Sequence, residues 1–257
     1  MAGKARVALV SGAGRGIGRA IALALAEDGA DVAVNYRRDA DSAAEVVAEI
    51  EAKGRRALAV QASVDDFDAC ESMVAQVMEH FGNLNVLVHN AGIASRGQSV
   101  EHTEPKELQR VMATHAFAGH YLARLSVPHM RGDGRGDIIM ISSAATKSLR
   151  GNGGPYNMAK SALEALAFTL AKEVRGDNIR VNVVAPGLVE TEMGRRLMRA
   201  SVGAESLREL DDQMPFGRVC QPEDVANAVR YLVSENNSYA TGEKIYIDGG
   251  GQDFRAY

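Results

Sequence analysis

The sequence predicts an α/β fold, a single domain built on a doubly wound parallel sheet of seven strands with helices on both faces. Short runs rich in β-branched residues recur along the chain, and several are apolar almost throughout, as is typical of strands covered on both faces. Longer amphipathic stretches separate these runs, and such an alternation gives a parallel sheet with right-handed crossovers. No Pro- or Ser-rich linker, low-complexity tract or repeat divides residues 1–257, so we expect one domain.

The expected strands and helices follow one another in order. The strands are residues 7–10, 32–35, 57–60, 86–89, 138–141, 181–184 and 244–247. The helices are residues 17–27, 41–53, 67–80, 105–129, 156–174 and 222–234. Gly29, Gly54 and Gly82 lie just past the first three helices, where a left-handed cap residue is commonly needed.

Residues 188–216 depart from this rhythm. The segment lies between the sixth and seventh strands and mixes charged residues with apolar ones such as Met193, Met198 and Leu207. This pattern favours a short helical lid over a pocket, and a plain surface insertion is the alternative.

A glycine-rich loop joins the first expected strand to the first expected helix. Gly12, Gly16 and Gly18 follow a G-x-x-x-G-x-G spacing. Glycines let the chain turn sharply and bring backbone N–H groups and a helix N-terminus against a pyrophosphate. The strand before the loop and the helix after it therefore indicate a dinucleotide site in a Rossmann-type sheet rather than a bare turn.

Tyr156 and Lys160 are four residues apart. Four residues are about one helical turn, so both side chains project from the same helix face. The unperturbed pKa of a Tyr is roughly 10, and a nearby cation favours the phenolate. Such a pair can act as an acid or a base near neutral pH, although the spacing also arises by chance in many helices.

Six motifs, in order and at the right spacing, resemble those of the short-chain dehydrogenase/reductases, and the resemblance covers essentially the whole chain. Besides the glycine loop and Tyr156-x-x-x-Lys160, these motifs are Asn90-Ala91-Gly92, Ser143, Pro186-Gly187 and the closing Asp248-Gly249-Gly250. Within the family the chain is most similar to the 3-oxoacyl-carrier-protein reductase group, on the evidence of Asn152-Gly153-Gly154 and Val183-Val184-Ala185-Pro186-Gly187.

The resemblance implies an oxidoreductase that moves a hydride between nicotinamide and a carbonyl carbon. It implies that Tyr156 donates a proton to the carbonyl oxygen, while Lys160 binds the nicotinamide ribose and lowers the Tyr pKa. Ser143 would hydrogen-bond the substrate oxygen. Ser142 is its adjacent competitor, but alternation in the strand turns that side chain to the other face.

The resemblance also implies a set of cofactor contacts. They are Gly12, Arg15, Gly16, Ile17, Gly18, Arg37, Arg38, Ser63, Val64, Asn90, Ala91, Gly92, Tyr156, Lys160, Pro186, Gly187, Val189 and Thr191. Thr191 would contact the nicotinamide carboxamide. Ser63 stands where the family usually has an Asp beside the adenine, and a Ser can still hydrogen-bond there.

The end of the second strand favours NADP(H) over NAD(H). An acidic residue there would accept hydrogen bonds from the adenosine ribose, but Tyr36 occupies the position. Arg37 and Arg38 follow, and Arg15 lies in the glycine loop. A guanidinium can pair bidentately with a phosphate, so these arginines suit the 2′-phosphate.

His115 occupies a helix position where the family commonly has an Asn. The backbone carbonyl of that Asn helps to hold a water that leads protons to the Lys. We therefore list His115 as a candidate catalytic residue in a proton relay. As a His titrating at about 6.5 it could also alter the pH profile. The alternative is a His that faces solvent or packs in the helix.

Three functions fit these residues. The first is an NADPH-dependent carbonyl reductase acting on a small ketone, a quinone, a polyketide or an acyl-carrier-protein thioester. The second is an NAD-dependent dehydrogenase of a secondary alcohol of sugar or steroid type, which the missing acid at Tyr36 disfavours. The third is a non-catalytic NADP-binding protein, which the presence of Ser143, Tyr156 and Lys160 disfavours.

Charges that we expect to flank the entrance count against an acidic carrier protein as the partner. The acidic residues are Asp133, Asp137, Asp177 and 205–212, and the basic residues that partly offset them are Arg131, Arg135 and Arg175.

The composition limits partners and location. The formal net charge of −4 gives no electrostatic case for nucleic acid or a membrane surface. Cys70 and Cys220 are far apart with no Cys/His cluster nearby, which indicates a reducing compartment and no metal site. No apolar run approaches the roughly 20 residues that span a bilayer, and no signal peptide is apparent. We expect a cytoplasmic protein and, from the resemblance, a homotetramer.

Overall fold

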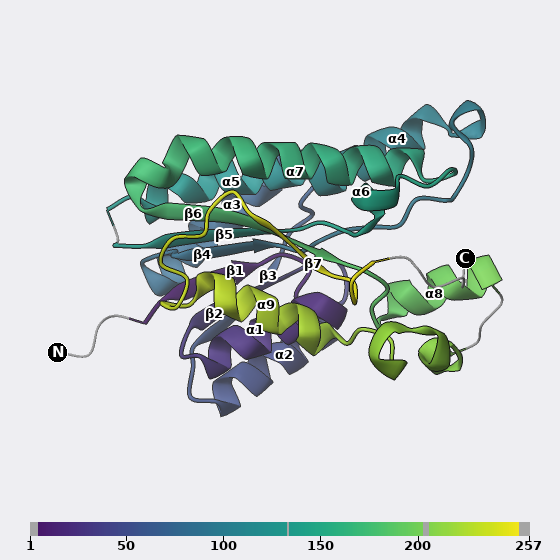
Figure 1. Cartoon of the computed structure of the whole chain (residues 1–257). Helices are drawn as coiled ribbons and strands as arrows, with labels where there is room; N and C mark the ends of the chain where they lie inside the picture. Colours follow the sequence, from purple (N-terminus) through teal and green to yellow (C-terminus); the bar gives the residue numbers. More distant parts are fainter. Residues whose placement is uncertain (1–4, 133, 203–205, 252–257) are drawn as a thin grey trace.

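A seven-stranded parallel sheet organises the computed structural model, which describes residues 5–132, 134–202 and 206–251 (Figure 1). The strands are β1 Val7–Val10, β2 Asp31–Tyr36, β3 Ala57–Gln61, β4 Val86–His89, β5 Gly136–Ile141, β6 Ile179–Pro186 and β7 Lys244–Ile247. Their order in the sheet is β3-β2-β1-β4-β5-β6-β7, and neighbouring strands run parallel. The predicted α/β class and the seven strands are confirmed.

Helices form a layer on each face of the sheet (Figure 1). The layer on one face consists of α1 Gly16–Glu27, α2 Ala40–Ala52 and α9 Pro222–Val233. The layer on the other face consists of α3 Phe67–Phe81, α5 Ala118–Met130 and α7 Gly154–Val174. Shorter helices follow strand ends or extend from these layers, namely α4 Pro105–Met112, α6 Ala145–Ser148 and α8 Glu192–Val202.

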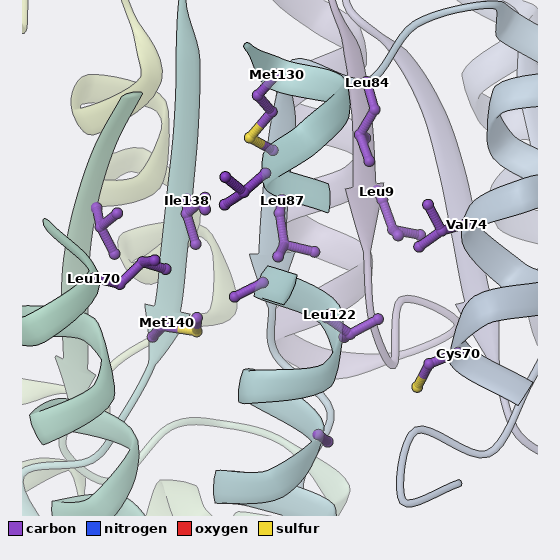
Figure 2. Close-up of a cluster of buried hydrophobic side chains, with 14 of the residues drawn as sticks. Leu9, Cys70, Val74, Leu84, Leu87, Leu122, Met130, Ile138, Met140 and Leu170 are labelled. Atoms are coloured by element: carbon purple, nitrogen blue, oxygen red, sulfur yellow. The ribbon is translucent and has the colours of Figure 1, made fainter. Parts of the chain in front are cut away.

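The core between the sheet and the α3, α5 and α7 layer is built from large apolar side chains (Figure 2). The strands contribute Leu9, Leu87, Ile138 and Met140, and the helices contribute Val74, Leu122, Met130 and Leu170. Each fully buried side chain of this size stabilises the fold by about 1.5–3 kcal/mol, so the packing holds the strand ends in fixed positions.

The helix predicted over residues 105–129 is divided into three parts. After α4 comes η2 Ala113–Phe117, a five-residue π-helical segment, and α5 follows it directly. π-helical turns inside longer helices are frequent at functional sites. Here the turn contains His115, whose side chain is buried.

The described part of the segment at 188–216 contains helices, as predicted. It contains α8 and the 3₁₀ segments η4 Leu207–Gln213 and η5 Pro215–Gly217. Its apolar side chains Met198, Leu207, Leu210 and Met214 form a small cluster with Val219, which lies just after the segment. Its closure over a pocket stays a prediction.

The described residues include neither a membrane-spanning helix nor a metal-binding cluster. No helix among them has the length and apolar character needed to cross a membrane. The same residues contain no group of three or more His, Cys, Asp or Glu placed to hold a metal ion. Cys70 is buried and Cys220 half-buried, and both are free thiols.

Candidate active site

The glycine loop lies at the carboxyl edge of the sheet, where β1 and β4 are neighbours and the strand order reverses. This is where open α/β sheets bind their ligands. Gly12 and Gly16 adopt φ values of +63° and +55°, which favour glycine. A Cβ on Gly18 would lie 2.3 Å from the Gly12 carbonyl oxygen and 2.5 Å from Asn90 Nδ2. The helix start therefore approaches the strand as closely as a glycine allows.

Buried polar side chains hold this loop. Asn35 Oδ1 accepts from the Gly12 N–H at 3.1 Å, and Asn90 Nδ2 donates to the carbonyls of Ser11 and Gly12 at 3.0 and 3.1 Å. Ser11 Oγ accepts from the N–H groups of Asn90 and Ala91, both at 3.0 Å. Our sequence analysis missed Ser11 and Asn35, although each is a polar residue at the end of an apolar strand.

The end of β2 presents two exposed cations. Tyr36 is half-buried, whereas Arg37 and Arg38 are exposed. Asp39 is the nearest acid in sequence, and its carboxylate caps α2 by accepting from the Ser42 N–H at 3.1 Å and the Ser42 hydroxyl at 2.8 Å. This end of the site is suited to a phosphate.

Arg15 and Thr191 connect the glycine loop to the segment that carries α8. Arg15 forms an ion pair with Glu192 at 2.9 Å, an exposed pair of small energetic value. Thr191 Oγ1 accepts from the Gly194 N–H at 3.0 Å, and its methyl group lies 3.3 Å from where a Cβ of Gly16 would be. Thr191 therefore lies against the loop.

The other predicted cofactor residues also lie along this edge. The Ser63 hydroxyl donates to Asp65, and Val64 is buried. The Gly187 N–H donates to the Ile247 carbonyl at 2.9 Å, and Val189 pairs with Cys220 in an isolated bridge. The residues that complete this set are Ile17, Ala91, Gly92 and Pro186.

Tyr156, Ser143 and Lys160 meet between β5 and α7. Tyr156 lies in the first turn of α7 and forms a side-chain hydrogen bond with Ser143, which follows β5. Lys160, one turn further along, is buried, and its Nζ donates to the Ile141 carbonyl at 2.8 Å. The Ser142 hydroxyl is turned away and donates to Glu164, as the strand alternation predicted.

The electrostatics of the pair differ from our expectation. Burial raises the pKa of Tyr156, while its hydrogen bond with Ser143 acts in the opposite direction. Lys160 Nζ lies 5.7 Å from the centre of the phenol ring and donates to a backbone carbonyl, and burial outweighs its effect on that pKa. Burial lowers the pKa of Lys160 itself to about 7, and Glu164 opposes this shift. Tyr156 is therefore protonated at neutral pH, the form that a proton donor needs.

His115 lies against Tyr156, with the two rings edge to face and their centres 5.4 Å apart. Its Nε2 is 2.9 Å from the carbonyl oxygen and 3.1 Å from the nitrogen of Ile93. Burial lowers the pKa of His115 well below its ordinary value, and the Lys160 charge adds to this. Of the two alternatives to a relay, the buried side chain contradicts a His that faces solvent and fits one that packs in the helix, and its pKa lies well below 6.5. Its part in a proton relay stays a prediction.

His89 was not predicted, yet it connects the glycine loop to His115. Ser11 Oγ, which already accepts two N–H groups, lies 3.1 Å from His89 Nδ1 and so donates its own proton there. His89 Nε2 then carries the ring proton and donates to the His115 carbonyl at 2.9 Å. The sequence did contain a signal for this residue, because His89 is a polar residue at the end of the apolar run 86–89.

Most of the charges expected near the entrance lie elsewhere, but residues 206–212 lie in and just before η4, in the segment that follows β6. Asp137 and Arg135 lie at the start of β5, and Arg131 and Asp177 are joined by an ion pair of 2.7 Å before β5 and β6. Arg175 begins η3, which precedes β6. The amino ends of parallel strands lie at the opposite edge of the sheet from Ser143, so our placement of these residues was wrong. Asp133 and Glu205 lie outside the described residues.

Comparisons with known proteins show relatives over most of the chain. Residues 12–252 match the family described as enoyl-(acyl carrier protein) reductase. Versicolorin reductase stcU of Emericella nidulans is 38% identical over 254 residues, with 95% of each chain covered. The 3-oxoacyl-(acyl-carrier-protein) reductase FabG of Staphylococcus aureus is 38% identical over 246 residues, which cover 95% of this chain and 96% of that protein.

Solved structures have the same fold. A short chain dehydrogenase from Burkholderia cenocepacia in complex with NADP matches with a TM-score of 0.85 at 34% identity, over 95% of this chain and 96% of that one. A variant of a Serratia marcescens short-chain dehydrogenase/reductase matches with a TM-score of 0.86 at 36% identity, over 95% and 97% of the two chains. The chain belongs to the short-chain dehydrogenase/reductase family and is an NAD(P)-dependent oxidoreductase.

Proposed function

We propose that the protein reduces a carbonyl group, in a ketone or a 3-oxoacyl group, to a secondary alcohol with NADPH. The observation that carries this proposal is the placement of a protonated Tyr156 beside Ser143, at the edge of the sheet where the glycine loop lies. A phenol poised there can protonate a carbonyl oxygen as charge develops on it.

Ser143, Tyr156 and Lys160 have different roles in this proposal. Bound NADPH supplies the hydride that forms the new C–H bond at the carbonyl carbon, while the π electrons of the C=O bond move to oxygen. The Ser143 hydroxyl orients that oxygen, and the Tyr156 O–H proton is transferred to it. Lys160, buried one turn away, favours the phenolate that remains.

The preference for NADPH rests on the residues that follow β2. The glycine loop and the start of α1 can hold a pyrophosphate, and this fits either cofactor. Arg37 and Arg38 are exposed, while the carboxylate of Asp39 is engaged at the start of α2. A 2′-phosphate would find two guanidinium partners there. The Burkholderia cenocepacia relative, whose structure contains NADP, supports the same choice.

Apolar side chains near the site favour a substrate with an apolar body. Val100, Leu149 and Met193 are exposed, and they come from η1 Val100–His102, the turn after α6 and the first turn of α8. A methyl of Val100 lies 3.4 Å from where a Cβ of Gly154 would be, beside the start of α7. Relatives named for versicolorin and 3-oxoacyl substrates fit this class.

A rate comparison tests the proposal. NADPH and NADH oxidation would be followed with cyclic ketones, quinones and 3-oxoacyl thioesters of pantetheine. We expect turnover with NADPH and an apolar ketone or thioester, and the responding class identifies the substrate. A preference for NAD⁺ and secondary alcohols would instead support the dehydrogenase alternative. NADPH binding without turnover over the whole panel would support a non-catalytic protein.

The cytoplasmic location and the homotetramer remain proposals drawn from the family resemblance. Exposed apolar residues at neighbouring positions, Phe117 in η2 and Met158 in α7, support a partner surface on these helices. Sedimentation at micromolar concentration distinguishes a tetramer from a monomer. The carrier protein stays a candidate partner. Asp137 and Asp177, which counted against it, lie at the opposite edge of the sheet, whereas Glu209, Asp211 and Asp212 lie in η4, in the segment that follows β6.

A further inference from the structure

A buried carboxylate lies one helical turn beyond Lys160. Glu164 is in α7, and both of its oxygens are engaged. Oε1 accepts from the Ser142 hydroxyl and, at 2.9 Å, from the Thr146 hydroxyl. Oε2 accepts from Lys244 Nζ at 2.8 Å. Charged groups are almost never buried without a partner, so this cluster is a built feature of the fold.

The cluster draws its members from four elements. Ser142 follows β5, Thr146 is in α6, Glu164 is in α7 and Lys244 begins β7. Lys244 Nζ also donates to Thr146 Oγ1 at 2.7 Å, which closes the network. The Ser143 carbonyl also lies 2.9 Å from the Thr146 hydroxyl, whose one proton is shared between this carbonyl and Glu164 Oε1. The network therefore fixes the loop that carries Ser143.

Glu164 stands between two cations. It forms an ion pair with Lys244 at 2.8 Å, and it lies one turn along α7 from the buried Lys160, whose pKa its charge raises. The other groups that face Lys160 carry no compensating charge. They are Tyr156 from α7, the Ile141 carbonyl from β5, His89 from β4 and His115 from η2. Burial keeps both histidines neutral.

We propose that Glu164 is a positioning residue for the reduction: it keeps Lys160 charged beside the site, and Lys244 of the last strand moderates this effect by sharing the same carboxylate. The inference rests on the proposed function, in which a charged Lys160 favours the phenolate of Tyr156. The ion pair to Lys244 makes β7, far from Lys160 in sequence, a part of the site.

The structure supports opposite effects for the two partners. Burial lowers the pKa of Lys160 to about 7, and Glu164 acts against that shift. Glu164→Gln keeps an acceptor for Ser142 and Thr146 but removes the charge, so Lys160 should lose its proton at lower pH. Lys244→Met leaves the carboxylate without its ion pair, so Lys160 should keep its proton to higher pH. If Glu164 and Lys244 had only a structural role, both substitutions would lower the stability of the protein, but they would not shift the pKa of Lys160 in opposite directions.

Titration by NMR tests this independently of turnover. The protein would be labelled with ¹³C-lysine, and the Lys160 Cε signal would be assigned by its loss in Lys160→Arg. We expect its titration midpoint to fall by about one pH unit in Glu164→Gln and to rise in Lys244→Met. Lys147→Met is the matched control, because Lys147 also lies near the Tyr246 ring but pairs with Asp248, and it should leave the midpoint unchanged.

The pH dependence of turnover is a second test of the proposal. The pH at which NADPH-dependent turnover falls on the alkaline side should move in the same directions as the NMR midpoint. A midpoint that stays in place in both variants, or that moves the same way in both, overturns the proposal. If Glu164→Gln does not fold, Lys244→Met still decides it, because an unchanged or lowered midpoint there contradicts the shared carboxylate. Absence of turnover in the wild type would refute the proposed function and leave the NMR test intact.

Discussion

A methyl group added at Gly92 should disturb the site through His115. A Cβ on Gly92 would lie 2.6 Å from His115 Cε1 and 3.2 Å from its Nδ1. The imidazole has little room to retreat, because it is 1% exposed, lies edge to face against Tyr156 and has its Nε2 at the Ile93 backbone. Overpacking of this kind costs about 1–3 kcal/mol. At about 2–4 °C per kcal/mol, the melting temperature should fall by about 2–12 °C.

A double-mutant cycle isolates that contact. Urea unfolding would give the free energy for the wild type, Gly92→Ala, His115→Ala and the double variant. Without the imidazole the added methyl has space, so Gly92→Ala should cost about 1–3 kcal/mol less in the His115→Ala background. Gly151→Ala is the control, because its Cβ would meet nothing within 4 Å. If the losses in unfolding free energy of the two single variants add up to the loss in the double variant, the proposed contact between a Gly92 methyl group and His115 is refuted.

Three further predictions concern the cofactor and the buried histidines. Gly18→Ala should fold but lose at least about 100-fold in NADPH affinity by fluorescence titration, because its Cβ would lie 2.3 Å from the Gly12 carbonyl oxygen and displace the loop. Arg37→Asp should shift the kcat/KM preference from NADPH towards NADH, since a carboxylate repels a 2′-phosphate, and an unchanged ratio would place the phosphate elsewhere. Burial lowers the pKa of His89 to about 4, so the unfolded chain binds this proton first as the pH falls. Between pH 6.5 and 5 the wild type should therefore lose about 2 kcal/mol more stability than His89→Asn, and equal losses in urea unfolding would contradict a neutral His89.

The sheet and its helices could be predicted because burial leaves a periodic pattern. The apolar runs at β1, β4 and β5 and the glycine loop after β1 each give a local signal that tertiary contacts reinforce. The π-helical turn at η2 gives none that we identified, because a five-residue segment is too short to be told from the α-helical turns on either side of it. The single helix predicted there missed the inward position of His115 for this reason.

The contacts between the elements could not be predicted from the sequence. Ser11, Asn35 and His89 come from three strands, and their hydrogen bonds depend on strand order and register. The pKa of Tyr156 depends on burial, which outweighs the nearby Lys160 because the ammonium donates to Ile141. Spacing along a helix places two side chains on one face, but it does not say which atom each one meets.

The most direct test of the proposed mechanism is a single-turnover measurement on Tyr156→Phe. The variant would be saturated with NADPH, mixed with the substrate that the panel identifies, and followed by loss of nicotinamide absorbance. The phenyl ring keeps the contact with His115 but has no proton to give. We predict an NADPH dissociation constant close to that of the wild type and hydride transfer at least about 100-fold slower. Hydride transfer at the wild-type rate would contradict the assignment of Tyr156 as the proton donor.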